Sequence, residues 1–193
     1  MRELKYLVAC TVDGFIARAD GSFDFFPSDG EHFADLIAQF PEMLPTHMRA
    51  QFDLAGAPNR EFDTVLMGRR TYQVGLDAGI ASPYSHLKQY VFTRSMKQSP
   101  SADVTLVATE KPAELVARLK REDGQPIWLC GGSQLAAALF SEIDELILKV
   151  SPIVIGSGLP LFAAPVPVTT LRLVSTTPYS NGFVLSRYRK AGH

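Results

Sequence analysis

The stretch Phe62-Asp63-Thr64-Val65-Leu66-Met67-Gly68-Arg69-Arg70-Thr71-Tyr72 decides how the rest of this 193-residue chain is interpreted. It has a short apolar run, a glycine, and then two arginines and a threonine that open a helix. The N-terminus of a helix presents unsatisfied N–H groups and partial positive charge, so phosphate binds there. Gly68 allows close backbone approach, and Arg69 and Arg70 can grip phosphate oxygens. An ordinary strand–turn–helix with two solvated arginines remains the alternative.

The composition predicts one globular α/β domain over residues 1–193. With 46% hydrophobic and 20% charged residues, the chain can bury a proper core. A net charge of -1 gives no electrostatic case for binding nucleic acid or an anionic membrane. Cys10 and Cys130 lie in apolar runs, which indicates reduced thiols and a cytoplasmic location. No metal site is expected, because metal-ligand spacing is lacking among the histidines His32, His47, His86 and His193.

Strands and helices alternate along the chain, and the chain closes on an antiparallel pair around Ser180-Asn181-Gly182. This order favours a mostly parallel sheet with an antiparallel edge. A capping box, Ser28 with Glu31, is expected to start the first helix, and the segments 12–17 and 41–60 are expected to be irregular. The expected strands are 4–11, 64–67, 87–93, 104–108, 126–130, 145–155, 171–177 and 183–189, and the later helices begin at Arg69 or span 112–121 and 134–140.

Three strand ends carry sequence that suits phosphate: Gly68 to Thr71, Thr93-Arg94-Ser95, and Gly131 to Gln134. Ligands of open α/β sheets bind beyond the carboxyl ends of the strands. Three such ends together suit a dinucleotide. The chain has neither G-x-G-x-x-G after its first strand nor a G-x-x-x-x-G-K-[ST] loop, so the common dinucleotide fold and the P-loop are not supported.

Several motifs together resemble a known family. The segments FDTVLMGRRTY and ACTVDGFIA and the Gly131-Gly132 turn resemble the dihydrofolate reductase fold. The segment WLCGGSQLAAALFSEIDELILKVSPIVIGSGLPLF is similar to the reductase domain of bifunctional riboflavin-biosynthesis proteins. The resemblance covers nearly the whole chain, and less clearly residues 41–60. It implies a dihydrofolate reductase-like α/β fold, with helices on both faces of a mostly parallel sheet and an antiparallel C-terminal hairpin.

The resemblance also implies an NADPH-dependent reductase and assigns residues to the cofactor. Ala9 and Ile16 would border the nicotinamide. For Gly131-Gly132, a simple tight turn is the alternative. The phosphate-binding residues that the resemblance implies are Arg69, Arg70 and Thr71, then Thr93, Arg94 and Ser95 for the 2′-phosphate, and Gly131, Gly132, Ser133, Gln134 and Leu135 for the pyrophosphate.

The proton that must accompany hydride transfer has two candidate sources. Phe26-Pro27-Ser28-Asp29 resembles the substrate-carboxylate segment of dihydrofolate reductases, so Asp29 would bind a pteridine- or pyrimidine-like ring and guide protonation. Asp29 could instead only complement a helix dipole. Asp13 is the second candidate, and beside Gly14 it could simply shape the loop.

Two departures from the folate enzyme weaken dihydrofolate as the substrate. His86-Leu87-Lys88 stands where that enzyme has an arginine for the glutamate tail, and Lys149 stands where it has a threonine near the ring. The prediction is therefore a reductase of a small pyrimidine or pteridine, similar to 5-amino-6-(5-phosphoribosylamino)uracil reductase. Dihydrofolate reductase and a non-catalytic NADPH-binding sensor or scaffold are the alternatives. A homodimer is expected, through residues 153–155 and 159–162.

Overall fold

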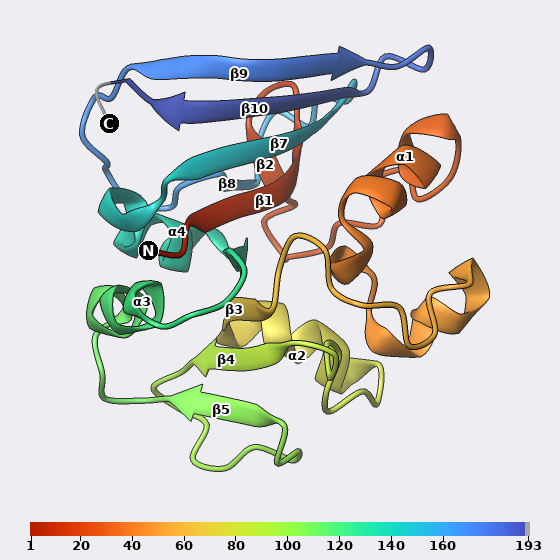
Figure 1. Cartoon of the computed structure of the whole chain (residues 1–193). Helices are drawn as coiled ribbons and strands as arrows, with labels where there is room; N and C mark the ends of the chain where they lie inside the picture. Colours follow the sequence, from red (N-terminus) through yellow and green to blue (C-terminus); the bar gives the residue numbers. More distant parts are fainter. Residues whose placement is uncertain (192–193) are drawn as a thin grey trace.

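The computed structural model describes residues 1–191 and contains one mixed eight-stranded sheet. The strand order is β5-β4-β3-β6-β1-β7-β10-β9, with β5 at the bottom edge and β9 at the top in Figure 1. Five neighbouring pairs, from β5 to β7, are parallel, and β10 is antiparallel to both β7 and β9. The predicted α/β class with an antiparallel C-terminal hairpin is confirmed. The strands are β1 (Leu4–Thr11), β3 (Thr64–Gly68), β4 (Lys88–Phe92), β5 (Val104–Val107), β6 (Ile127–Gly131), β7 (Glu145–Ser151), β9 (Leu171–Pro178) and β10 (Val184–Lys190).

Helices cover both faces of this sheet, because alternate strand residues feed two separate cores. Leu66 of β3 packs with the cluster that includes α3 and α4, while its neighbour Val65 packs with α1 and Tyr72 of α2. Figure 1 places α1 at the right of the view and α3 at the left. The helices are α1 (Glu31–Gln39), α2 (Arg69–Asp77), α3 (Pro112–Arg121) and α4 (Ser133–Ala138), with 3₁₀ helices η1 (Pro41–Met43), η2 (Thr46–Phe52) and η3 (Phe140–Glu142).

Several predicted boundaries are wrong for identifiable reasons. The capping box is absent, because Gly30 is the N-cap of α1 and its φ of 91° turns the chain away from Ser28. The predicted strand 145–155 stops at Ser151, because Pro152 has no N–H to continue the ladder. The segment 12–17 contains a short strand, β2 (Phe15–Ala17), which pairs with β8 (Leu159–Pro160).

The helix predicted at 134–140 begins one residue earlier, at Ser133, and ends at Ala138. Residues 41–60, expected to be irregular, hold the two 3₁₀ helices η1 and η2, and prolines precede or open each of them. Within residues 1–191, no helix has the length and hydropathy needed to cross a bilayer. His193 lies outside the described residues.

A buried ion-pair network fixes the start of β7. The side chain of Glu145 has 0% exposure and binds Lys5 (Nζ–Oε2 3.2 Å) and Arg187 (Nε–Oε1 2.6 Å). Burial alone would raise the pKa of Glu145, but the Arg187 hydrogen bond and the charge of Lys5 outweigh it and lower that pKa below its ordinary value. The ionised carboxylate therefore stabilises the folded state.

We expect Glu145→Gln to lower the free energy of unfolding by about 3 kcal/mol, because it removes the ion-pair partner of Arg187 and one of the carboxylates that bind the buried Lys5. Because the pKa of Glu145 is lowered in the folded state, the carboxylate contributes its full stabilisation at pH values above its unfolded-state pKa of about 4.3. This stabilisation is lost as the pH falls through the folded-state pKa. Urea unfolding should therefore show the largest difference from wild type near neutral pH and a smaller one in acid. Glu114→Gln, at a side chain with 60% exposure, is the control and should change stability by less than about 0.5 kcal/mol. An equal loss in the two variants would contradict the network.

Candidate functional site

The predicted phosphate-binding segments lie side by side at one edge of the sheet. They follow β4, β3 and β6, which are consecutive in the strand order and mutually parallel. The end of β1 comes next, because β1 pairs in parallel with β6. Parallel strands bring their carboxyl ends to the same edge, so segments more than sixty residues apart meet there.

The β3–α2 turn and the β6–α4 turn are in direct contact. A Cβ atom built on Gly68 would lie 3.4 Å from the Gly132 nitrogen and 3.6 Å from the Gly131 oxygen. A Cβ built on Gly132 would lie 3.6 Å from Thr71 Oγ1. The peptide bond between Gly131 and Gly132 is cis. The two turns therefore form one backbone surface without side chains, which we call the glycine cradle (Gly68, Gly131 and Gly132 with Thr71 beside them).

The two arginines of α2 differ in their surroundings. Arg69 is half-buried and donates through Nη1 to Gln73, while its Nε is buried and has no hydrogen-bond partner among residues 1–191. Arg70 is exposed. A buried donor without a partner costs stability, and an anionic ligand at Arg69 would supply the missing hydrogen-bond acceptor.

The segment Thr93-Arg94-Ser95 forms a turn at the end of β4. The buried hydroxyl of Thr93 accepts hydrogen bonds from the N–H groups of Ser95 (3.3 Å) and Met96 (3.0 Å). Thr93 is thus used inside the turn, which presents Arg94 and Ser95 to solvent. The free side chains at this strand end are the arginine and the serine.

Of the three residues that follow the glycine cradle in α4, two are buried and one is exposed. Ser133 is buried, and its carbonyl accepts the N–H of Ala163 (3.2 Å), which ties the 159–163 segment to the start of α4. Gln134 is exposed, whereas Leu135 has 7% exposure and packs in the core with α3. Gln134 can reach a ligand, and Leu135 holds α4 against the sheet.

The two residues predicted to border the nicotinamide lie on either side of the β1–β2 turn. Ala9 is half-buried near the carboxyl end of β1 and stands opposite Lys149 of β7. Ile16 belongs to β2 and packs against the core that contains α3 and α4. The turn between them is bound to the 159–163 segment, because Gly14 accepts a hydrogen bond from the N–H of Leu161 (3.1 Å).

The candidate carboxylates lie in exposed positions. Asp29 precedes the N-cap of α1 and makes no hydrogen bond to residues 1–191. Asp13 accepts hydrogen bonds from the N–H groups of Ile155 (3.2 Å) and Gly156 (2.8 Å). A hydrogen bond with Thr11, together with these N–H donors, lowers the pKa of Asp13, so it stays ionised and joins two loops. Neither carboxylate is desolvated in this structure.

His86 and Lys149, the two departures from the folate enzyme, have different surroundings. His86 Nδ1 lies 2.8 Å from Thr46 Oγ1, and Nε2 lies 3.2 Å from the Glu42 carbonyl, to which it must donate. Burial, together with the charge of Arg49, lowers the pKa of His86 to about 4, so it is a neutral clamp for residues 41–52. Lys149, by contrast, does not clamp another segment in this way. The sequence predicted no site role for it, although a lone charge inside the apolar run Leu146 to Val150 was a signal that could have pointed to one.

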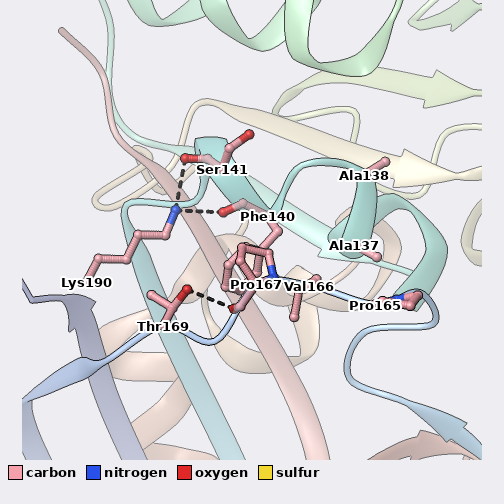
Figure 2. A pocket seen from close by; sticks show the side chains of 9 residues that line it. All are labelled: Ala137, Ala138, Phe140, Ser141, Pro165, Val166, Pro167, Thr169 and Lys190. Atoms are coloured by element: carbon pink, nitrogen blue, oxygen red, sulfur yellow. Dashed lines mark hydrogen bonds between the residues drawn. The ribbon is translucent and has the colours of Figure 1, made fainter.

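Two cavities of about 430 Å³ lie away from the strand ends. The first lies between α4 and residues 165–169, and Figure 2 shows Lys190 bonded to the carbonyls of Phe140 (2.7 Å) and Ser141 (2.9 Å) at its rim. The second lies beside η2 and is bordered by His86. Neither is lined by a predicted site residue. Across residues 1–191, no group of three or more His, Cys, Asp or Glu side chains is placed to hold a metal ion.

The family model described as the RibD C-terminal domain matches residues 3–185. The chain belongs to this family. It is 32% identical over 194 residues to the uncharacterized protein YwjB of Bacillus subtilis strain 168, covering 97% of this chain and 98% of that protein. The predicted family is therefore confirmed, and the family is one of reductase-like domains.

Two solved structures extend this likeness to the fold. The first is a diaminohydroxyphosphoribosylaminopyrimidine deaminase/5-amino-6-(5-phosphoribosylamino)uracil reductase from Thermotoga maritima, with a TM-score of 0.66, 17% identity, and coverage of 98% of this chain and 57% of that chain. The second is dihydrofolate reductase from Enterococcus faecalis complexed with NADP(H), with a TM-score of 0.63, 16% identity, and coverage of 98% and 96%. The dihydrofolate reductase-like fold is confirmed.

The glycine cradle makes a prediction about folding. Gly131 has a φ of +132°, which L side chains rarely adopt, so Gly131→Ala should lower the free energy of unfolding by about 1–3 kcal/mol. Gly132 has no such φ, and its added Cβ would have room 3.6 Å from Thr71 Oγ1, so Gly132→Ala should be nearly neutral. Urea unfolding of the two variants measures the difference. Equal stability of the two variants would show that the turn is not constrained at Gly131.

Proposed function

We propose that this protein is an NADPH-dependent reductase of a small pyrimidine- or pteridine-like substrate. The observation that carries the proposal is the glycine cradle at the carboxyl ends of parallel strands, with the unpartnered Nε of Arg69 on the adjoining helix. A surface of bare backbone beside a helix N-terminus and a guanidinium with an unpartnered Nε suits a pyrophosphate. Membership in the RibD C-terminal domain family supports the same reaction class.

The residues present fit the cofactor along its length. Arg69, Arg70 and Thr71 would hold phosphate oxygens, and Gly131 to Gln134 would allow the pyrophosphate to approach the backbone. The exposed Arg94 and Ser95 would bind the 2′-phosphate through charge-assisted hydrogen bonds. Ala9 and Ile16 would border the nicotinamide. NADPH, when bound, supplies the hydride, and the chain must orient the substrate, exclude water and deliver a proton.

The substrate class rests on two supports. The Thermotoga maritima protein, which shares this fold, bears a name that includes 5-amino-6-(5-phosphoribosylamino)uracil reductase. His86 is occupied by Thr46 and the Glu42 carbonyl, so it offers no cation to a folate glutamate tail, which disfavours the dihydrofolate reductase alternative. The other alternative is an NADPH-binding sensor or scaffold, which would bind the cofactor but oxidise it with no member of a panel of aminopyrimidines, pterins and quinones.

The proposal includes a cytoplasmic homodimer. The thiols of Cys10 and Cys130 are free, as in a reducing compartment. All eight residues of β9 are exposed, including Leu171, Leu173 and Val174, and β9 is paired on one edge only. An exposed apolar edge strand is a surface that a second copy could cover. Of the segments predicted to form the interface, Val154 is 70% exposed, whereas Leu161 and Phe162 pack against the core.

The cofactor assignment predicts a preference for NADPH over NADH of at least tenfold, because a charge-assisted contact contributes roughly 1.5–3 kcal/mol. Arg94→Ala should remove most of this preference by weakening NADPH alone. Fluorescence titration of both nucleotides measures the dissociation constants. Arg121→Ala, which also removes an exposed arginine, is the matched control and should bind NADPH like wild type. Equal wild-type affinities for the two nucleotides would refute the assignment.

If the protein is a homodimer, light scattering at micromolar concentration should give a molar mass of about twice the 21.2 kDa of one chain. Leu173→Lys places a charge on β9 and should give the monomer. Val74→Lys makes the same change at an exposed position of α2 and should leave the dimer intact. A wild-type mass of one chain would exclude the dimer.

A further inference from the structure

Lys149 is a charged side chain set among uncharged cross-strand neighbours. It lies on β7, opposite Ala9 of β1 on one side and Leu185 of β10 on the other. Its Nζ lies 3.9 Å from the Sδ of Met43, a residue of η1 that packs with the core beneath α1. Lys149 therefore lies on the sheet face that α1 and η1 cover, two residues before the carboxyl end of its strand.

No anion in this part of the protein compensates the ammonium. Lys149 forms no ion pair with any carboxylate in residues 1–191, and within these residues its Nζ has Met43 Sδ as its one hydrogen-bond partner. Glu42, the residue beside Met43, turns Oε1 toward the N–H groups of Arg60 and Glu61 instead. The ammonium is therefore left with a thioether sulfur, which is only a weak acceptor.

The titratable groups coupled to Lys149, directly or through Cys130, are uncharged. Burial raises the pKa of the Cys130 thiol to about 12 and that of Cys10 to about 11, despite the opposing effect of the lysine charge. Tyr84, which is hydrogen-bonded to Cys130, has its pKa raised well above the ordinary value by burial. All three groups are neutral at pH 7.

An uncompensated cation in this position works against folding. Burial lowers the pKa of Lys149, because the ammonium loses hydration and gains no counter-charge. The residue is nevertheless half-buried rather than fully buried, so part of it remains open to solvent. A group that costs stability, remains accessible and is a stronger acid than a surface lysine has the properties of a functional residue.

The position of Lys149 is also suitable for the chemistry. It is level with Ala9, the residue assigned to the edge of the nicotinamide, while Asp29 is exposed and Asp13 is bound to backbone N–H groups. The proton needed beside the hydride acceptor thus has a nearer source than either carboxylate.

We propose that Lys149 is the general acid of the reduction and touches the heteroatom of the substrate's C=N or C=O bond. This inference rests on the proposed function. NADPH, when bound, would supply the hydride for the new C–H bond and would leave as NADP⁺, while the π electrons of the double bond move to the nitrogen or oxygen. That atom takes a proton from the Lys149 ammonium, whose N–H bond breaks. The neutral amine then takes a proton from solvent, so the reaction as a whole consumes one NADPH and one proton.

Turnover with NADPH against aminopyrimidines, pterins and quinones tests the role. Lys149→Met replaces the cation with an apolar chain of similar length, so kcat should fall by about 10²–10⁴-fold while the NADPH dissociation constant stays within twofold. Its melting temperature should equal or exceed that of wild type, because an uncompensated charge is removed. Lys111→Met removes an exposed lysine and should leave turnover and melting temperature unchanged.

Lys149→Arg separates proton donation from charge. Arginine keeps the cation but does not lose its proton, so KM should change little and kcat should still fall at least tenfold. In wild type, kcat should fall as pH rises through the Lys149 pKa, because the acid must be protonated, and Lys149→Met should lack this decline. Full kcat in Lys149→Arg, or a collapse of kcat in Asp29→Asn but not in Lys149→Met, would overturn the proposal.

A measurement that does not depend on turnover keeps the two proposals distinguishable. Trace acetylation by acetic anhydride across pH 7–11, read by mass spectrometry, gives the amine pKa of Lys149 and of the surface control Lys111 in one sample. Lys149 should titrate at lower pH than Lys111 and be protected by saturating NADPH together with a reducible panel member. A Lys149 titration at or above that of Lys111 overturns the inference, whereas failure of NADPH to bind overturns the proposed function instead.

Discussion

The parallel pairing of β1 with both β6 and β7 is the constraint on which the rest of the structure depends. β1 is bonded to β7 along its whole length, from Lys5 opposite Glu145 to Thr11 opposite Ser151. Its alternate side chains feed the two cores, with Tyr6 on the side of α3 and α4 and Leu7 on the side of α1. Because parallel strands share a direction, this pairing gathers their carboxyl ends at one edge. β3 and β4 continue the same parallel pairing beyond β6, so the glycine cradle, the Arg94 turn and Ala9 belong to a single region.

Close backbone approach at that region limits its sequence. Gly68 and Gly132 come from different βα turns, yet a Cβ on the first would be in van der Waals contact with the backbone of the second. A Cβ has room at either position, but a side chain longer than that of alanine would fill the surface assigned to phosphate. Thr71 adds a hydroxyl at the same place without adding bulk. Small residues at these positions thus serve packing and ligand access together.

The sequence predicts the strands better than it predicts helix starts and the burial of charged side chains. The helix at 112–121 is found as expected, because Pro112 opens it and three apolar residues, Leu115, Val116 and Leu119, face the core. The alternation of strands and helices, the antiparallel C-terminal pair and the phosphate-friendly strand ends also follow from local patterns. The start of α1 does not, because a positive φ at Gly30 overrides the capping pair Ser28 and Glu31. Burial of a carboxylate or lysine depends on register and on distant segments, which no local pattern contains.

Glu145 and Lys149 illustrate this last point, because they are four residues apart on one strand and face the same side of the sheet. At Glu145, the register places Lys5 and Arg189 opposite a carboxylate with no exposure, and the nearby Arg187 binds it too, so both signs of charge are satisfied. At Lys149, the same two neighbouring strands supply Ala9 and Leu185, so the cation is left alone. A fold that can neutralise a buried charge at the amino end of β7 does not do so at the carboxyl end. Lys149 lies near the edge where ligands of such sheets bind. An uncompensated charge there costs stability but is available to a substrate.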